Sequence, residues 1–312
     1  MSLITTAETA DLHLQKLSRD VRVAAQKKQR FRQFVRPETE FGPHMGDQYK
    51  FVNVGNITEE AREVGERDDL PQGTLPITAK LCTCKEYSLE IPYTSRASLL
   101  SELSLESMII RKLMDNAVEK LDRLSGVPFL QCDFVYTPIG TVGNKDFTLG
   151  TAGVALDTAT RPMSAYDFKN IVGILKSDYN VPGFGGGNDY IAIVTESTTR
   201  ALTDDAEYVE VAKRVDPAKL LNGEVARYHS CRIIEENNVL NDNLPNGCGQ
   251  CVFFGDDPVV EIELYPLELQ RAIAESYGRT KGIRWTWYGG FARTWSFATE
   301  AEVRIIKVDS LP

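Results

Sequence analysis

The stretch that decides the fold runs from Asn180 to Asn238. It opens with Asn-Val-Pro-Gly-Phe-Gly-Gly-Gly-Asn-Asp-Tyr-Ile-Ala-Ile-Val-Thr over residues 180–195. After a short acidic helix predicted over 205–214, it closes with Leu-Leu-Asn-Gly-Glu-Val-Ala-Arg-Tyr-His-Ser-Cys-Arg-Ile-Ile-Glu-Glu-Asn-Asn over residues 220–238. The apolar run 190–194 predicts a buried strand. The glycines before it predict a tight connection from a helix over 161–179, because glycine adopts positive φ at little cost.

The glycine-rich loop does not have the context of a nucleotide site. A dinucleotide fingerprint follows a strand and opens a helix, so that the helix N-terminus faces the pyrophosphate. Here the predicted helix precedes the glycines and the predicted strand follows them. The order of elements therefore argues against nucleotide binding.

The rest of the chain predicts long elements around this mixed α/β unit. Apolar residues at three- and four-residue steps predict one helix over 98–125, ending at Gly126. Alternating apolar residues predict strands over 48–54 and 78–93. Further strands are predicted over 231–235, 251–254, 259–264, 282–288, 291–297 and 302–308, with a helical piece over 267–276. Gly289-Gly290 predicts a hairpin turn between two of these strands.

Composition excludes several classes of protein. The chain has 312 residues, a net charge of −9, 42% hydrophobic and 25% charged residues. These values are ordinary for a globular chain of about two domains, and the acidic balance argues against a surface that grips nucleic acid throughout. The longest apolar run, 190–194, is far too short to span a bilayer. The N-terminus lacks the pattern of a secretory signal, so we expect the protein to stay in the cytoplasm where it is made.

Residues that could carry chemistry are scattered. Cys248 and Cys251 have C-x-x-C spacing, but the nearest candidate pair to complete a zinc site, Cys82 and Cys84, has poor spacing for it, so we expect free thiols that pack in the interior. The three histidines stand far apart, and no two acidic residues are set apart as an acid–base pair. We expect no enzyme activity, no cofactor and no metal.

Two segments carry opposite charge. From Asp11 to Arg36 there are eight basic and two acidic residues, a local balance of +6. From Glu59 to Asp69 there are six acids and two arginines, a balance of −4. The first segment is too poor in apolar residues to fold alone. The second lies in a polar tip, 55–76, that is long for a loop inside a compact domain.

Taken in order, these features resemble major capsid proteins of tailed bacteriophages, of the coliphage N4 type. The resemblance is carried by Phe-Arg-Gln-Phe-Val-Arg-Pro-Glu-Thr-Glu-Phe (31–41), the excursion 46–93, the long helix, the loop 182–190 and the turn 222–224. It implies an α+β chain with the Hong Kong 97-type capsid fold. The implied parts are an N-terminal arm (1–45), an extended β-hairpin loop (46–93), a peripheral domain with a long spine helix (94–160 and 278–312) and a mixed α/β axial domain (161–277).

The same resemblance implies a structural role. The protein would self-assemble through hexamers and pentamers into the icosahedral head shell that encloses the phage DNA without reading its sequence. We expect assembly in the host cytoplasm, residence in the virion capsid and no membrane association. Because the arm begins near Met1, we expect a separate scaffolding protein, along with a portal and decoration proteins as partners.

The opposite charges suggest where subunits meet. We expect the basic arm (Arg22, Lys27, Lys28, Arg30, Arg32) to lie on the acidic tip of a neighbouring subunit (Glu59, Glu60, Glu63, Glu66), with complementary charge fixing the register. An arm that faces the packaged DNA is the alternative. Trp285 and Trp287 lie in an aromatic cluster that predicts sheet packing plus a subunit contact, since aromatic residues are common interface anchors; stacking on single-stranded bases is the alternative.

Two other readings of the whole chain remain. An encapsulin-like nanocompartment shell shares the fold but encloses a cargo enzyme. A two-domain enzyme would use the Gly183–Gly187 loop for a nucleotide or Cys248 and Cys251 for zinc.

Overall fold

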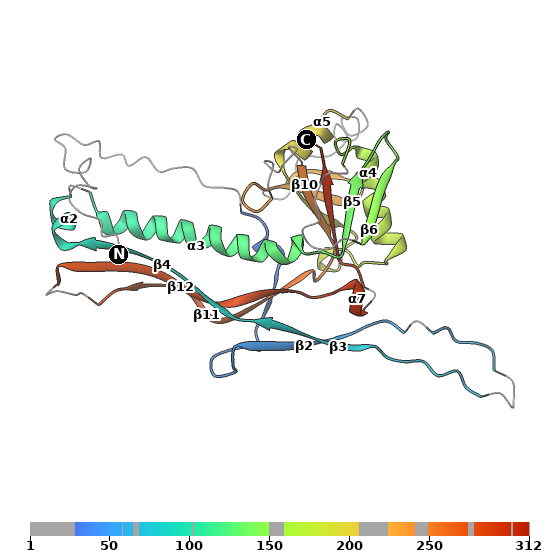
Figure 1. Ribbon diagram of the computed structural model, residues 1–312, viewed down its shortest axis with the longest axis horizontal. Coiled ribbons are helices and arrows are strands. Elements are labelled where there is room, and N and C mark those ends of the chain that lie inside the picture. Colours follow the sequence, from blue (N-terminus) through green and yellow to red (C-terminus); the bar gives the residue numbers. More distant parts are fainter. Residues whose placement is uncertain are drawn as a thin grey trace.

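The computed structural model describes residues 29–57, 59–64, 69–101, 103–149, 159–205, 224–240, 249–273, 278–300 and 302–311. It is elongated. A long helix lies along a ribbon of long strands, a rounder α/β unit sits at one end, and a thin hairpin extends beneath that unit (Figure 1).

The long ribbon is a four-stranded sheet in the order β1-β11-β12-β4. Its strands are β1 (Arg36–Glu38), β11 (Val259–Arg271), β12 (Thr280–Arg293) and β4 (Lys85–Thr94). β1 pairs with β11 in parallel, whereas β11–β12 and β12–β4 are antiparallel. The spine helix α3 (Leu105–Leu130) covers one face and buries Leu113, Ala117 and Leu121 against the sheet.

The single helix predicted over 98–125 is two helices in the structure. α2 (Ser95–Leu100) is capped by Thr94, whose Oγ1 accepts from the backbone N–H of Ala97 at 3.2 Å. The chain breaks because Ser101 exchanges hydrogen bonds with the backbone of Leu103, which competes with helical pairing. α3 then runs past the predicted end. Gly126 is not a terminus, since its bare Cα makes room for Val239; an added Cβ would lie 2.5 Å from Val239 Cγ1.

Two predictions for the ribbon were wrong. The helical piece predicted over 267–276 is strand up to Arg271, because it pairs with β12, for example Leu269 with Trp285. The hairpin turn predicted at Gly289-Gly290 is absent, and β12 runs straight through both glycines. They let neighbouring backbone approach closely instead, since a Cβ at Gly289 or Gly290 would lie 2.4 Å from the carbonyl oxygen of Ile262 or Thr83, respectively.

The rounder unit is built on a seven-stranded sheet in the order β6-β5-β13-β10-β7-β9-β8. The strands are β5 (Phe134–Pro138), β6 (Lys145–Leu149), β7 (Tyr190–Val194), β8 (Glu224–Tyr228), β9 (Cys231–Glu235), β10 (Gly249–Phe254) and β13 (Ile305–Ser310). Every residue of β7 is buried, as its apolar run predicted, because separate apolar clusters cover the two faces of the sheet.

Short helices complete this unit. α4 (Ala165–Gly173) continues into a π-helical turn, η2 (Ile174–Asp178), where one helix was predicted over 161–179. α5 (Glu196–Thr203) was not predicted, and the helix predicted over 205–214 lies outside the described residues apart from Asp205. The remaining short elements are η1 (Arg32–Phe34), η3 (Phe184–Gly186) and α7 (Phe297–Glu300).

The sheet corrects one part of the predicted domain division. Residues 134–149 and 305–310 had been assigned to the peripheral domain, but β5, β6 and β13 are strands of the seven-stranded sheet. β13 pairs with both β10 and β5, and Ile306 and Val308 are fully buried. The end of the chain therefore completes the core of the rounder unit.

The thin hairpin consists of β2 (Gln48–Val54) and β3 (Ile77–Thr83). The two strands pair in register from Gln48–Thr83 to Val54–Ile77. The loop between them projects well beyond the ribbon sheet (Figure 1). The strand predicted over 48–54 is confirmed. The single return strand predicted over 78–93 is wrong, because it is divided into β3, which pairs with β2, and β4, which pairs with β12 in the ribbon.

Candidate assembly surfaces

The hairpin is fixed to its own chain through one face only. Asn53 Nδ2 and Lys80 Nζ donate to the carbonyl oxygen of Thr294 at 2.5 and 2.9 Å, just beyond β12. Lys80 also pairs with the buried carboxylate of Glu300 at 3.0 Å, and Thr78 donates to the same carboxylate. Burial lowers the pKa of Lys80, and the Glu300 carboxylate offsets part of this shift. The base of the hairpin is therefore held rigidly at the end of the ribbon.

The opposite face of the hairpin is apolar and open to solvent. Residues that pair directly across two strands share a face, and so do residues two apart on one strand. This face is made of Lys50, Val52, Val54, Ile77, Ala79 and Leu81, all of them exposed. Val54 and Ile77 oppose each other and are 53% and 62% exposed. We call these six residues the hairpin face.

The hairpin face was not predicted from the sequence. Its signal was present, since Val52, Val54, Ile77 and Leu81 repeat with period two. The alternation was read only as evidence for strands. Which of the two faces packs on the chain depends on contacts with Thr294 and Glu300, which are more than 200 positions away in the sequence.

The acidic tip is solvent-exposed where it is described. Glu59, Glu60 and Glu63 are all exposed, and Glu59 accepts a hydrogen bond from Thr74 Oγ1 at 2.7 Å. Glu66 lies outside the described residues. The three described carboxylates therefore face outward, as the proposed subunit contact requires.

The arm residues predicted to contact a neighbour's tip differ in their surroundings. Arg22, Lys27 and Lys28 lie outside the described residues. Arg32 makes a two-nitrogen contact with the carboxylate of Glu261 on β11 in its own chain, with the nearest pair at 2.7 Å. The guanidinium of Arg32 is thus already engaged, which removes it from the predicted contact with a neighbour's tip. Arg30 Nε is buried without a hydrogen-bond partner.

Trp285 and Trp287 do not lie on an outer surface. Both are buried between β12 and α3, and Trp287 has no exposed surface at all. Their indole N–H groups donate to Asn116 Oδ1 at 3.2 Å and to Glu263 Oε1 at 2.9 Å. The sheet packing predicted for them is present, but the subunit contact is wrong, because the spine helix of the same chain occupies the face toward which they point.

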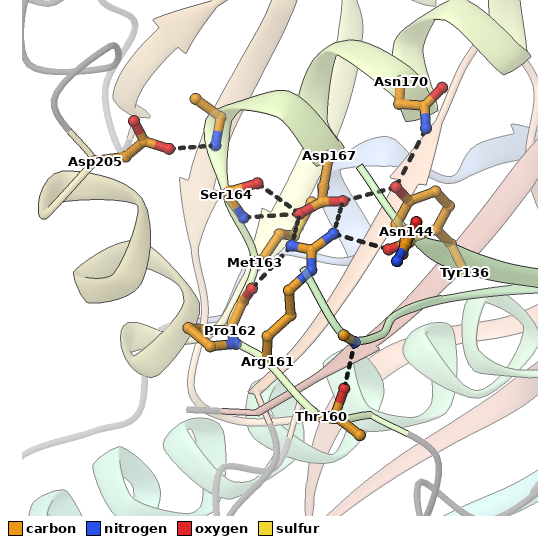
Figure 2. Close-up of polar contacts among 12 residues, drawn as sticks. Tyr136, Asn144, Thr160, Arg161, Pro162, Met163, Ser164, Asp167, Asn170 and Asp205 are labelled. Atoms are coloured by element: carbon orange, nitrogen blue, oxygen red, sulfur yellow. Dashed lines mark hydrogen bonds and ion pairs between the residues drawn. The ribbon is translucent and has the colours of Figure 1, made fainter. Parts of the chain in front are cut away.

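A buried polar cluster ties the start of α4 to β5 (Figure 2). Asp167 is fully buried and accepts from Arg161 Nη2 at 2.7 Å, from Ser164 Oγ at 2.7 Å and from the hydroxyl of Tyr136 at 2.7 Å. Burial alone would raise the pKa of Asp167, but these donors outweigh it and hold the pKa below its ordinary value. With every partner donating to one carboxylate, the cluster is built to fix structure.

The glycines of the loop 183–187 form a tight turn before β7. Gly185 and Gly186 have φ of 63° and 74°, and a Cβ at Gly183 would lie 2.1 Å from the carbonyl oxygen of Gly187. The backbone N–H of Gly185 donates to Asp256 Oδ1 at 3.0 Å. A helix precedes the loop and β7 follows it, as predicted, so the glycines make a turn rather than open a helix.

The described cysteines are dispersed through the interior. Cys82 and Cys84 pack between the hairpin and β11, while Cys251 lies in the core of the seven-stranded sheet. Burial raises the pKa of Cys82 to about 12 and that of Cys132 to about 11. Cys248 lies outside the described residues.

Among the described residues, no group of His, Cys, Asp and Glu side chains is placed to hold a metal ion. None of the described helices is long and apolar enough to cross a membrane.

Comparison by sequence finds no matching family model and no matching curated protein. Comparison by structure finds phage capsids. A chain of the head structure of Helicobacter pylori bacteriophage KHP40 matches with a TM-score of 0.71 and 12% identity over 99% of this chain and 98% of that one. A chain of the capsid of Ralstonia phage GP4 matches with a TM-score of 0.67 and 14% identity, over 96% and 95%. A chain of the cyanophage Pam1 capsid matches with a TM-score of 0.67 and 11% identity, over 99% and 98%. At these identities the likeness is one of fold, and it shows that this chain has the predicted Hong Kong 97-type capsid fold.

Proposed function

We propose that this protein is the major capsid protein of a tailed phage of the coliphage N4 type, a structural and non-catalytic role. The observation that carries the proposal is the fold likeness to phage capsid chains, which covers nearly the whole length of both partners. In this role many copies form hexamers and pentamers, which close into the head shell around the DNA. Assembly would take place in the host cytoplasm with a scaffolding protein, a portal and decoration proteins.

The hairpin face fits a contact between copies. A shell is built from heterologous contacts that rotation closes into rings. Such a contact requires an exposed apolar surface on one partner that the isolated chain leaves uncovered. The hairpin face supplies it, and its base is anchored, so little conformational freedom is lost when it docks. The proposed parts remain the arm, the extended hairpin, the peripheral domain and the axial domain. Of the strands, β5, β6 and β13 move to the axial domain, whereas β4 and β11, which pair with β12 in the ribbon, move to the peripheral domain.

The direct test is to express the chain, alone and with a scaffolding protein encoded beside it, and to follow it by sedimentation velocity and electron microscopy. Closed shells, tubes or capsomer rings are the expected result. A chain that stays monomeric at high concentration with the scaffolding protein present would overturn the proposal. Nucleic acid or a protein cargo inside purified particles would separate a phage head from a nanocompartment.

The arm and tip are proposed to meet between neighbouring subunits. On the tip, Glu59, Glu60 and Glu63 face solvent, and Glu66 belongs to the same acidic segment. On the arm, the residues proposed to meet them are Arg22, Lys27, Lys28 and Arg30. Reversing the charge of Glu59, Glu60 and Glu63 to lysine changes the balance of the tip from −4 to +2. Assembly is expected to be slower at low salt and to speed up as salt is added, because screening then weakens a repulsion instead of an attraction. Light scattering over a series of NaCl concentrations measures both effects.

The matched control reverses three exposed acids on the axial domain, Asp178, Glu196 and Asp204, so that the net charge changes equally. It should assemble with the wild-type salt dependence. If the tip reversal also behaved like the wild type, the contact between arm and tip would be wrong. Cross-linking of filled particles would then test whether the arm faces DNA instead.

A further inference from the structure

A groove of about 460 Å³ separates the hairpin from one edge of the ribbon sheet. One wall is β2 along residues 49–54, and the opposite wall includes Arg36 and Glu38 of β1. β1 is an edge strand of the four-stranded sheet, and in the described part of the chain β2 pairs with β3 alone. Residues of two edge strands thus line the same groove, which we call the edge groove.

The register of the hairpin shows which backbone groups of β2 point away from β3. Antiparallel partners alternate between hydrogen-bonded and non-hydrogen-bonded pairs. Backbone hydrogen bonds of 2.8 Å join the returning segment to Asp47 before β2 and to Gly55 after it, so the odd-numbered residues of β2 bond to β3. The N–H and C=O groups of Lys50, Val52 and Val54 therefore point outward, and all three residues line the edge groove.

The edge groove also contains polar atoms that lack partners. Thr294 Oγ1, Trp295 Nε1 and Asp257 Oδ1 are buried and have no hydrogen-bond partner among the described residues. All three residues line the groove, and Thr294 is only 6% exposed. Buried polar groups in folded proteins are nearly always bonded. The carboxylate of Asp257 can turn either oxygen toward the groove, because rotation about its last bond is broad and two-fold. The edge groove is therefore incomplete in the single chain.

The charge of the edge groove favours a basic occupant. Its charged lining residues are Arg36, Glu38, Glu40, Lys50 and Asp257. Arg36 is turned to Asp257 at 3.6 Å. The other two carboxylates act on β2 across the groove: burial raises the pKa of the Tyr49 hydroxyl, and the charges of Glu38 and Glu40 raise it further. A segment lying between β1 and β2 would therefore meet negative charge on its inner side.

A strand added to β2 needs two different faces, because its side chains alternate. One face would continue the hairpin face beside its exposed valines, and the other would meet the acids of the groove. Residues 21–28 of the arm, Val-Arg-Val-Ala-Ala-Gln-Lys-Lys, have this pattern. Val21 and Val23 fall on one face and Arg22 and Lys28 on the other. Valine also favours extended backbone.

We propose that the edge groove is a strand-addition site and that its occupant is the segment 21–28 of a second copy of this chain. The segment pairs through its backbone with Lys50, Val52 and Val54 and places Arg22 against the acids of the groove. The inference rests on the proposed shell-forming role, because it joins two copies. It deepens the contact between arm and hairpin, since β2 leads directly into the acidic tip.

A synthetic peptide of residues 21–28 with blocked ends tests the site on the unassembled, full-length chain. When it binds, the amide protons of Lys50, Val52 and Val54 should exchange roughly tenfold more slowly. Those of Phe51 and Asn53 should change little, because they are already bonded to β3. This alternation is the mark of strand pairing. Equal protection of all these amides, or protection of none of them, would overturn the proposal.

Substitutions on both partners separate backbone pairing from charge. Val52→Pro removes an outward N–H without removing a bond to β3, and edge strands tolerate proline at such positions. It should weaken peptide binding, followed by the fluorescence of Trp295, on the order of tenfold, whereas Val52→Thr keeps the N–H and should retain binding. In the peptide, Arg22→Glu should weaken binding on the order of tenfold at low salt, and Arg22→Lys should retain it. Wild-type affinity of Val52→Pro or of the Arg22→Glu peptide would overturn the proposal, and the peptide variants decide the question if Val52→Pro does not fold.

Cross-linking identifies the source of the segment. A chain with Val23→Cys and Val52→Cys is oxidised in assembled particles and compared with Val52→Cys alone. Disulfide-linked dimers and larger multimers are expected on a denaturing gel. Linkage within one chain, or protection of the outward amides in particles without any linkage, would place the chain's own arm or a separate polypeptide in the groove and overturn the proposal. The peptide titration needs no particles, so a failure of the shell-forming role and a failure of the strand-addition site are distinguishable.

Discussion

Replacing both Val54 and Ile77 by aspartate is expected to abolish particle formation while leaving the stability of the isolated chain nearly unchanged. The two side chains oppose each other at the outer end of the hairpin face and are largely exposed in the single chain. Exposed substitutions of this kind each change the free energy of unfolding by about 0.5 kcal/mol or less, and the repulsion between two facing aspartates adds about 0.2–1 kcal/mol. Their effect on the monomer is therefore small.

In a shell the same substitutions would be costly at every contact. Full burial of a valine or isoleucine side chain contributes about 1.5–3 kcal/mol, and that contribution would be lost at both positions. Each aspartate would in addition bring an unpaired charge into an apolar contact. Because each subunit repeats the contact, the loss recurs at every position of the shell. Sedimentation velocity should show only unassembled chain, with an unfolding temperature close to that of the wild type.

The matched control is Val142→Asp, an equally exposed valine in the turn between β5 and β6. It should assemble like the wild type. Normal particles from the Val54→Asp/Ile77→Asp variant would show that the hairpin face is not a subunit contact, even if the chain forms shells by other surfaces.

The largest effect on stability is expected from Asp167→Ala. Removing one partner of a buried ion pair leaves an uncompensated charge and costs about 3–5 kcal/mol. Here the substitution strands the guanidinium of Arg161 and also leaves the hydroxyl of Tyr136 and the N-cap of α4 without an acceptor. Urea unfolding at pH 7 measures the loss of free energy. Asp178→Ala, exposed at the end of η2, is the control and should change it by less than about 0.5 kcal/mol.

The same cluster predicts that the stability of the chain depends on pH. The pKa of Asp167 is lowered in the folded chain, so its contribution to stability is present above pH 3.8 and is lost as the pH falls through the folded-state value. Asp167→Ala should lack this acid-sensitive component. A loss below about 1 kcal/mol at pH 7, or an unchanged acid profile, would show that the cluster does not stabilise the fold.

Local sequence patterns were sufficient for the elements whose apolar spacing matches their burial. The run Tyr190–Val194 is a fully buried strand. The strand predicted over 48–54 pairs with β3, which is the first part of the strand predicted over 78–93. The three- and four-residue apolar steps of 105–124 line the buried side of the spine helix. The order of these elements also carried the resemblance that predicted the capsid fold. In each case the deciding information lies within a few turns of helix or one strand pair.

The tertiary structure decided everything that depends on partners far along the chain. Residues 267–271 form a strand because they pair with β12. Gly289 and Gly290 do not form a turn; they let neighbouring backbone approach β12 closely. Trp287 is buried beneath α3. Arg32 donates hydrogen bonds to Glu261, which is 229 positions away in the sequence. β13 lies within the seven-stranded sheet of the axial domain. Cross-strand pairing and the burial of large apolar side chains contribute more free energy than local preferences, which differ by roughly 1 kcal/mol per residue. The sequence by itself therefore determined the elements whose local apolar pattern matches their burial, such as β7 and the spine helix. The tertiary contacts decided the remaining elements and determined which faces stay open to a neighbour.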